Sequence, residues 1–376
     1  MRYNAGGAGL TGSEENPLVS VVIPTFNEAE VIERTIAEVS AILKREGIEY
    51  EIIVVDDNSP DGTWRIVEEV SKRDPRVRLY RRIGARGLST AILDGIKFAK
   101  GKYVVVMDAD LQHPPRYLPQ LIRKALNEGY EIVVASRYAR GGGVAGWSRL
   151  RLMISKGATL LAKLLVKGAR KTSDPMSGFF LVRRDLVLSR IEQLRPRGYK
   201  VLLEILARID NARVGEVPYV FEPRRAGKSK LGFKVMLDYI IHVIELSQLA
   251  KFAIVGAGGT VVNLAIMYLL LYIAGLGKAV SSIAGIESGL LWNFVFNEVW
   301  TFEAGFRKGW LARLAAYHAS SAGGFLATFL TMYMLSTYMG VNPILGQFIG
   351  ILVGFIVNYV ASSRGVWRIG GEGQGG

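Results

Sequence analysis

VVVMDADLQHPP, from Val104 to Pro115, joins a run of apolar residues to two closely spaced aspartates. The run from Tyr103 to Met107 is short and continuously apolar, which is typical of a buried strand in a parallel sheet. Asp108 and Asp110 follow at the carboxyl end of that strand, where open α/β sheets bind their ligands. Their carboxylates and the amide of Gln112 are hard oxygen ligands that suit Mg²⁺ or Mn²⁺ shared with a diphosphate. A polar turn without a metal is the alternative interpretation.

Predicted strands and helices alternate on both sides of this stretch. Short apolar runs predict strands at 18–24, 50–55, 77–80, 103–107 and 131–135, and the segments between them predict helices at 28–46, 63–73, 87–99 and 116–127. This alternation predicts an α/β fold with a doubly wound, mostly parallel sheet. Three polar clusters (25–28, 56–58 and 108–110) then line one edge of the sheet. Neither G-x-G-x-x-G nor a P-loop motif is present, so we expect a carboxylate-rich edge for a metal-bridged nucleotide.

Composition indicates a soluble part joined to a membrane part. Half of the 376 residues are hydrophobic, the mean hydropathy is +0.23, and the apolar excess lies after residue 250. The net charge is +14, which fits nucleic acid, anionic lipid or phosphorylated substrates, and the apolar segments favour the last two. There is no cysteine, which excludes disulfides. Residues 1–17 have no apolar core and are interpreted as a disordered tail rather than a signal peptide.

The membrane part is predicted to hold four spans within residues 251–369. The apolar stretches 252–276, 279–300, 311–339 and 341–361 are each long enough to cross a bilayer. Lys and Arg gather at one set of ends and only Lys278 lies at the other, so the positive-inside rule predicts a multi-pass protein of the cell membrane with a cytoplasmic N-terminal domain. Two amphipathic segments, 147–166 and 231–250, are predicted to lie in the membrane interface, with a core helix as the alternative for the first.

Several blocks occur together in a fixed order: PTFNE (24–28), VVDDNSPDGT (54–63), MDADLQHPP (107–115), ASRYARGGG (135–143), DPMSGFF (174–180), GYKVLLEIL (198–206) and RAGKSKLG (225–232). In this order they resemble the family 2 glycosyltransferases with a GT-A fold, and within these the dolichyl-phosphate mannose synthases and polyprenyl-phosphate sugar synthases. The resemblance covers residues 18–232. Residues 251–369 resemble the GtrA-like membrane domain through less specific motifs, and their four helices look like a two-fold repeat.

The resemblance implies which residues bind a nucleotide sugar. It places Pro24, Phe26, Glu28, Val55 and Asp57 around the base and ribose. Many relatives carry Tyr where this chain has Phe26. For Glu28, the alternative is a carboxylate that stabilises a helix N-terminus. The diphosphate and its Mg²⁺ or Mn²⁺ are assigned to Asp108, Ala109, Asp110 and Gln112, and a basic lid over the diphosphate to the loop that contains Arg224 and Lys230. A juxtamembrane basic patch is the alternative for that loop.

The acceptor side requires cations that hold a phosphate. Arg137 follows a predicted strand, and Arg151 and Ser155 are four residues apart, so they share one helix face. A guanidinium and a hydroxyl on one face suit a phosphate, with cations that merely reach the membrane surface as the alternative. Because an acceptor phosphate is already anionic, positioning and charge neutralisation are sufficient. We expect catalysis to depend on Asp110, Arg137, Arg151 and Ser155.

The predicted reaction is inverting, metal-dependent transfer of mannose from GDP-mannose to dolichyl or another polyprenyl phosphate. One alternative keeps the mechanism and uses UDP-glucose. Another is a transporter or flippase of lipid-linked sugars whose soluble domain only binds ligand. A processive polysaccharide synthase is disfavoured because the chain has no Q-x-x-R-W block. The predicted partners are a nucleotide sugar, a polyprenyl phosphate and the membrane, and no nucleic acid.

Overall fold

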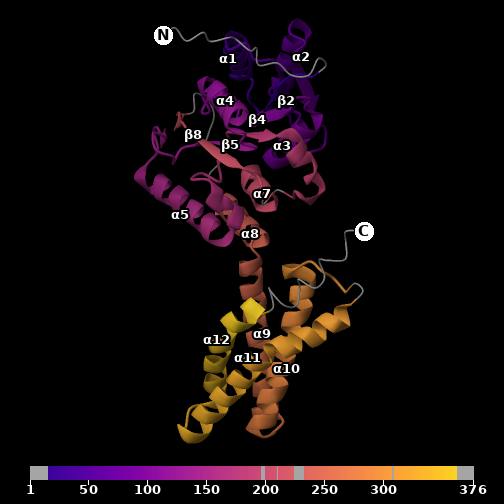
Figure 1. Cartoon of the computed structure of the whole chain (residues 1–376), viewed down its shortest axis with the longest axis vertical. Coiled ribbons are helices and arrows are strands. Elements are labelled where there is room, and N and C mark those ends of the chain that lie inside the picture. The colour runs from indigo at the N-terminus through magenta and orange to yellow at the C-terminus, as the bar shows by residue number, and fades with distance from the viewer. Residues whose placement is uncertain (1–15, 196–199, 210, 224–232, 307–308, 362–376) are drawn as a thin grey trace, which may run out of the picture. The chain divides into compact units, whose positions relative to one another are not determined.

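A computed structural model describes residues 16–195, 200–209, 211–223, 233–306 and 309–361 (Figure 1). The chain divides into two compact units, residues 1–246 and 247–376. The predicted tail at 1–17 lies almost entirely outside the described residues, as does the basic loop with Arg224 and Lys230.

The first unit is built on a seven-stranded sheet of order β3-β2-β1-β4-β7-β5-β8. All neighbours in it are parallel except β7, which runs antiparallel to both β4 and β5. The predicted mostly parallel sheet is thus confirmed, whereas β7 was not predicted. The strands are β1 (Val19–Thr25), β2 (Tyr50–Asp56), β3 (Val77–Arg81), β4 (Tyr103–Val106), β5 (Ile132–Ser136), β7 (Phe180–Arg183) and β8 (Val214–Pro218); a separate short pair is formed by β6 (Gly143–Val144) and β9 (Val220–Phe221).

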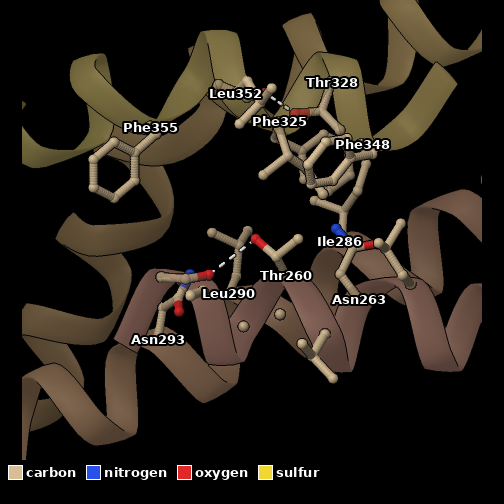
Figure 2. A pocket seen from close by; sticks show the side chains of 18 of the residues that line it. Thr260, Asn263, Ile286, Leu290, Asn293, Phe325, Thr328, Phe348, Leu352 and Phe355 are labelled. Carbon is tan, nitrogen blue, oxygen red and sulfur yellow. Dashed lines mark hydrogen bonds between the residues drawn. The ribbon is translucent and has the colours of Figure 1, made fainter. Parts of the chain in front are cut away.

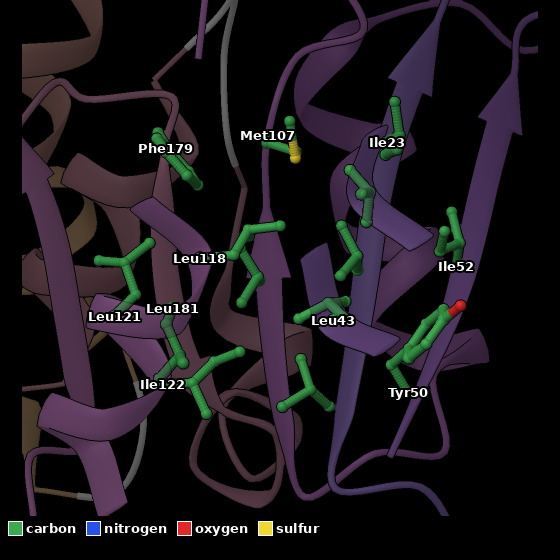
Figure 3. Packing of buried hydrophobic residues seen from close by; sticks show 14 of the residues in the cluster. Ile23, Leu43, Tyr50, Ile52, Met107, Leu118, Leu121, Ile122, Phe179 and Leu181 are labelled. Atoms are coloured by element: carbon green, nitrogen blue, oxygen red, sulfur yellow. The ribbon is translucent and has the colours of Figure 1, made fainter. Parts of the chain in front are cut away.

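Helices cover both faces of the sheet, because successive strand residues point to opposite faces and both sets are apolar. One face packs against α1 (Ile32–Arg45), α2 (Thr63–Arg73) and α4 (Leu118–Glu128), and Figure 3 shows part of this core around Met107 and Leu118. The other face packs against α3 (Leu88–Phe98), α6 (Arg184–Leu188) and α7 (Val201–Arg208). This two-sided burial fixes the carboxyl ends of β1, β2 and β4 at one edge of the sheet.

Two further helices of this unit carry apolar residues that its core does not bury. They are α5 (Arg149–Leu165) and α8 (Phe233–Leu246), which meet at a small cluster around Ala162, Leu203 and Val243. On α5 only Thr159 and Ala162 are buried, while Leu150 and Met153 are more than 65% exposed. The predicted helices at 147–166 and 231–250 are therefore present, although the second ends at Leu246 and a new helix starts at Gln248.

The described residues of the second unit form four long helices, as many as predicted: α9 (Gln248–Tyr268), α10 (Lys278–Phe296), α11 (Trp310–Tyr338) and α12 (Pro343–Ala361). Within the described residues, two segments are long and apolar enough to cross a membrane, Gln248–Ile273 and Lys278–Thr301. Each of these consists of a helix, α9 or α10, and the π-helical turn that follows it.

Two glycines one turn apart on one helix of each hairpin let the neighbouring helix approach closely. A Cβ on Gly289 of α10 would lie 2.8 Å from the Gly259 carbonyl oxygen of α9, and a Cβ on Gly350 of α12 would lie 2.8 Å from the Thr328 backbone of α11. Gly285 and Gly346, one turn earlier, make similar approaches. Small residues permit such close packing in membranes. The same device in both hairpins supports the predicted two-fold repeat.

Residues of all four helices line a cavity of about 460 Å³ in this unit (Figure 2). Phe325, Phe348 and Phe355 provide much of its apolar wall. Beside it, the Gln347 amide donates to Asn263 Oδ1 at 2.6 Å and accepts from Ser282 Oγ at 2.7 Å. Asn263 therefore bonds helix to helix.

Charged residues of this unit also pair across helices. His318 Nε2 lies 2.9 Å from a carboxylate oxygen of Glu287, which joins α11 to α10. Glu298 is fully buried and paired with Arg313 of α11. A partner from the next helix makes burial of this carboxylate possible.

Candidate active site

The D-x-D segment lies in a tight loop after β4. Leu111 adopts a left-handed backbone (φ +59°), and the Gln112 backbone N–H donates to Asp110 Oδ1 at 3.0 Å. The Ala109 carbonyl accepts from the Thr35 hydroxyl at 2.6 Å, and the Gln112 amide donates to the Glu222 carbonyl at 3.0 Å. Asp110 is buried and the Asp108 side chain is 38% exposed, so the loop holds two carboxylates at a partly open edge.

His113, to which the sequence analysis gave no role, supports this loop from the buried side. Its Nδ1 accepts the Asp108 backbone N–H at 3.0 Å, and the ring is 2% exposed. It stacks on Phe179 at 5.4 Å between ring centroids and meets Phe221 edge-on at 5.6 Å. Burial lowers the pKa of His113 to about 4, despite an opposing effect of Asp110. The ring is therefore neutral near pH 7 and acts as an acceptor.

The residues of this loop fit a metal that is shared with a substrate. In the described part of the chain, no group of three or more His, Cys, Asp or Glu side chains gathers in a way that would hold a metal. Mg²⁺ typically takes one or two carboxylates and completes its shell with substrate phosphates and water. Asp108 and Asp110 match that kind of site, while the Gln112 amide nitrogen donates to the Glu222 carbonyl.

The donor-side residues gather at the ends of β1 and β2. Pro24 and Val55 are neighbours in the strand register, and both are buried. Asp57 is 8% exposed and its two oxygens accept from Arg82 Nε at 2.6 Å and the Gly87 backbone N–H at 2.8 Å. Its carboxylate is therefore fixed in place by the segment that follows β3.

Glu28 and Phe26 follow β1 in the loop before α1. The Glu28 carbonyl accepts the backbone N–H groups of Val31 and Ile32 at 3.1 and 3.0 Å, so Glu28 stands at the turn that leads into α1, which is consistent with the helix-terminus alternative. Its backbone N–H donates to the Thr63 hydroxyl at 3.0 Å. The Phe26 ring has the guanidinium carbon of Arg86 4.7 Å from its centroid. Arg86 had not been singled out from the sequence.

On the acceptor side, Arg137 is held by Asp174. Arg137 donates to the Asp174 carboxylate through Nε at 2.7 Å and Nη2 at 2.8 Å, and its backbone N–H donates at 3.1 Å. Asp174 is fully buried. Burial lowers the pKa of the guanidinium, but the hydrogen bonds and charge of Asp174 outweigh it and raise the pKa above its usual value. Arg137 is thus a permanent cation in a fixed orientation.

Two of the three predicted acceptor residues, Arg137 and Arg151, converge on one aromatic ring. The guanidinium carbons of Arg137 and Arg151 lie 5.5 Å and 4.3 Å from the Trp147 ring centroid. The Tyr138 hydroxyl donates to Ser155 Oγ at 2.7 Å. Two cations and a hydroxyl pair therefore gather beside β5, as a phosphate site requires.

Sequence reasoning missed several residues that complete the site. Asp174 lies in the DPMSGFF block, which was recognised as a motif without a role for its carboxylate. Lys200, half-buried before α7, has a pKa lowered to about 8 by burial and by Arg137. Trp147 and Tyr138 carried no signal beyond their place in the neighbouring segments. Arg224 and Lys230 lie outside the described residues.

Comparison with known proteins shows the family of the chain. The model of glycosyl transferase family 2 matches residues 20–189, and that of the GtrA/DPMS transmembrane domain matches residues 251–367. A dolichol-phosphate mannosyltransferase of Pyrococcus furiosus is 38% identical over 356 residues, which are 93% of this chain and 99% of that protein. One of Mycosarcoma maydis is 35% identical over 65% of this chain and 84% of its own length.

Among solved structures, mannosyl-3-phosphoglycerate synthase of Rubrobacter xylanophilus is similar over 61% of this chain and 73% of its own, with a TM-score of 0.48 and 19% identity. The family assignment depends on the sequence relatives, which match both units in order. The chain belongs to the dolichol-phosphate mannosyltransferases, glycosyltransferases of family 2 with a GT-A fold, and carries a GtrA/DPMS membrane domain.

Proposed function

We propose that the protein transfers mannose from GDP-mannose to dolichyl or another polyprenyl phosphate, with inversion at the anomeric carbon. The products are the mannosyl lipid phosphate and GDP. The observation that carries this proposal is the pairing of two half-sites at one sheet edge: the Asp108–Asp110 loop for a diphosphate and the two arginines around Trp147 for a phosphate. The relatives named above support the choice of substrates.

The acceptor phosphate is the nucleophile in this reaction. One of its oxygens forms the bond to the anomeric carbon as the bond to the diphosphate oxygen breaks, and attack opposite the leaving group inverts that carbon. Arg137 and Arg151 hold the phosphate, and Ser155 with Tyr138 supplies hydroxyl contacts. No base is required because the phosphate is already ionised near neutral pH.

The leaving diphosphate needs its charge neutralised. Asp108 and Asp110 would hold Mg²⁺ or Mn²⁺, which when bound would supply that neutralisation. Pro24, Phe26, Glu28, Val55 and Asp57 hold the nucleoside, and Ala109 and Gln112 line the diphosphate. Arg224 and Lys230 belong to the loop that we assign to closure over the donor.

The membrane part is proposed to be multi-pass, with four spans and the catalytic domain in the cytoplasm. The exposed apolar residues of α5 and α8 support an interfacial position, because a lipid-borne phosphate is reached only at the membrane surface. The Lys and Arg distribution described above supports the orientation.

The test is donor turnover by the purified full chain in detergent, with Mn²⁺ or Mg²⁺ and dolichyl phosphate. Radiolabelled GDP-mannose and UDP-glucose are offered in parallel, and we expect label in the lipid phase from GDP-mannose alone. Label from UDP-glucose alone would keep the mechanism and overturn the donor. No lipid label from either, with nucleotide binding retained, would favour the transporter. Asp110→Ala that stays folded and still transfers mannose would contradict the metal assignment.

A further inference from the structure

The segment 82–87 is anchored to the donor side at both ends. Arg82, which is 4% exposed, donates to Asp57 through Nε at 2.6 Å and to Asp94 through Nη1 at 3.0 Å. Its Nη2 donates to the Gly87 carbonyl at 3.1 Å, and the Gly87 N–H donates to Asp57 at 2.8 Å. Asp57 and Arg82 therefore form a buried frame that fixes where the intervening residues lie.

Between these anchors the segment is exposed, and it presents Arg86 to Phe26. Ile83 is 78% exposed, and the Arg86 guanidinium lies 4.7 Å from the centroid of the Phe26 ring. Within the described part of the chain, Arg86 makes no ion pair with a carboxylate. Phe26 directly follows β1, which lies between β2 and β4, and parallel sheets bind ligands outside strand ends of this kind. A cation with five donors thus stands beside the ring that we assign to the base.

The chemistry of base edges determines which nucleotide suits such a group. Guanine presents two adjacent acceptors, O6 and N7, and a guanidinium donates to both at once. Adenine places an amino donor beside N7, which opposes a donor-only group. The other side of guanine O6 carries N–H donors, which suit a carboxylate such as Asp57. Because Phe26 has no hydroxyl, its ring adds stacking without base selectivity.

We propose that Arg86 is the residue that selects guanine as the base of the nucleotide-sugar donor, by donating to O6 and N7 while Phe26 stacks on the ring system. This inference rests on the proposed function, which places the base at Phe26. It goes further because it names the group that distinguishes guanosine, which offers two adjacent acceptors, from uridine, whose ring offers the single acceptor O4 on that edge, and from adenosine.

The experiment compares nucleotide binding by the full chain in detergent with Mn²⁺, using calorimetry with GDP, UDP, ADP and 7-deaza-GDP, which lacks N7. We expect wild type to prefer GDP, and Arg86→Ala to bind GDP about tenfold to a hundredfold more weakly with little change for UDP. Replacement of N7 should weaken binding to wild type but cause no further loss in Arg86→Ala. Arg65→Ala is the matched control, since Arg65 is an exposed arginine 5.1 Å from the Trp64 ring.

The possible outcomes separate this inference from the function on which it rests. If wild type binds no GDP, the proposed donor is wrong. If wild type binds GDP and Arg86→Ala binds it equally well, only the role of Arg86 is wrong. If Arg86→Ala weakened the binding of GDP, UDP and ADP equally, the role of Arg86 in base selection would also be wrong, because Arg86 would then hold the ribose or the diphosphate. A similar loss in Arg65→Ala would mean that surface charge, not base contact, explains the effect.

Discussion

His113 offers a sharp test of how the metal-binding loop is held in place. The ring accepts the Asp108 backbone N–H at 3.0 Å and packs between Phe179 and Phe221. It has therefore two separable roles, as a hydrogen-bond acceptor and as a buried ring. His113→Phe keeps a ring and removes the acceptor, whereas His113→Asn keeps an acceptor and removes the ring.

The structure sets the expected size of each loss. A buried backbone N–H left without a partner costs about 1–3 kcal/mol. Groups that orient metal ligands from behind typically change metal affinity about tenfold to a hundredfold when replaced. We therefore expect His113→Phe to bind Mn²⁺ about tenfold or more weakly, and His113→Asn to bind it nearly as wild type does. His113→Asn should instead lose unfolding free energy, because its small side chain leaves a cavity among aromatic rings.

The assay is Mn²⁺ titration followed by electron paramagnetic resonance, with GDP present, together with thermal unfolding of each variant. Normal Mn²⁺ affinity in a folded His113→Phe would refute the role assigned to the acceptor. The pH dependence gives a second check. The pKa of about 4 in the folded protein lies below the ordinary value of 6.5, so the neutral ring stabilises the fold fully above pH 6.5. That stabilisation is lost as the pH falls toward 4, and His113→Phe should remove this part of the acid sensitivity.

Three further predictions concern other parts of the chain. Asp174→Asn should leave the charge of Arg137 without its buried counter-ion. We expect kinetics to show a larger rise in the KM for the lipid phosphate than in the KM for the donor, and unfolding to show a loss of about 3–5 kcal/mol of stability. Lys200 has a pKa of about 8 and loses its charge as the pH rises through that value, so transfer should decline above pH 8, and Lys200→Gln should abolish that decline in the pH–rate profile. Gly289→Leu should lower the melting temperature of the membrane unit, since its Cβ meets the neighbouring backbone at 2.8 Å, while Gly323→Leu, whose Cβ has open space, should not.

Much of the fold was predictable because local patterns and tertiary structure agree. Strands β1, β2, β4 and β5 are short, largely apolar runs with polar residues at or just after their ends, and those ends meet at one edge of the sheet. Strand β7 was missed because Phe180–Arg183 follows a loop-like stretch and its position depends on pairing with β4 and β5. No local pattern specifies an antiparallel strand inserted between two others.

The candidate site likewise contains residues that local sequence predicts and residues that only tertiary contacts reveal. Asp108, Asp110, Arg137, Arg151 and Ser155 were predicted as site residues from motifs and spacing. Their supporting residues were not, because the supports come from distant segments: Asp174 reaches Arg137 across 37 residues of sequence. His113 was read as part of a motif, and only the folded loop shows which atom it contacts.

The buried frame and exposed tip of residues 82–87 have a consequence for how such enzymes diversify. The ion pair between Arg82 and Asp57 holds the ends of the segment, so the side chains between them are exposed and do not pack in the core. Substitutions at these exposed positions would therefore change the free energy of unfolding little. They would be able to alter which nucleotide the enzyme binds while the sheet, the metal loop and the phosphate site stay unchanged.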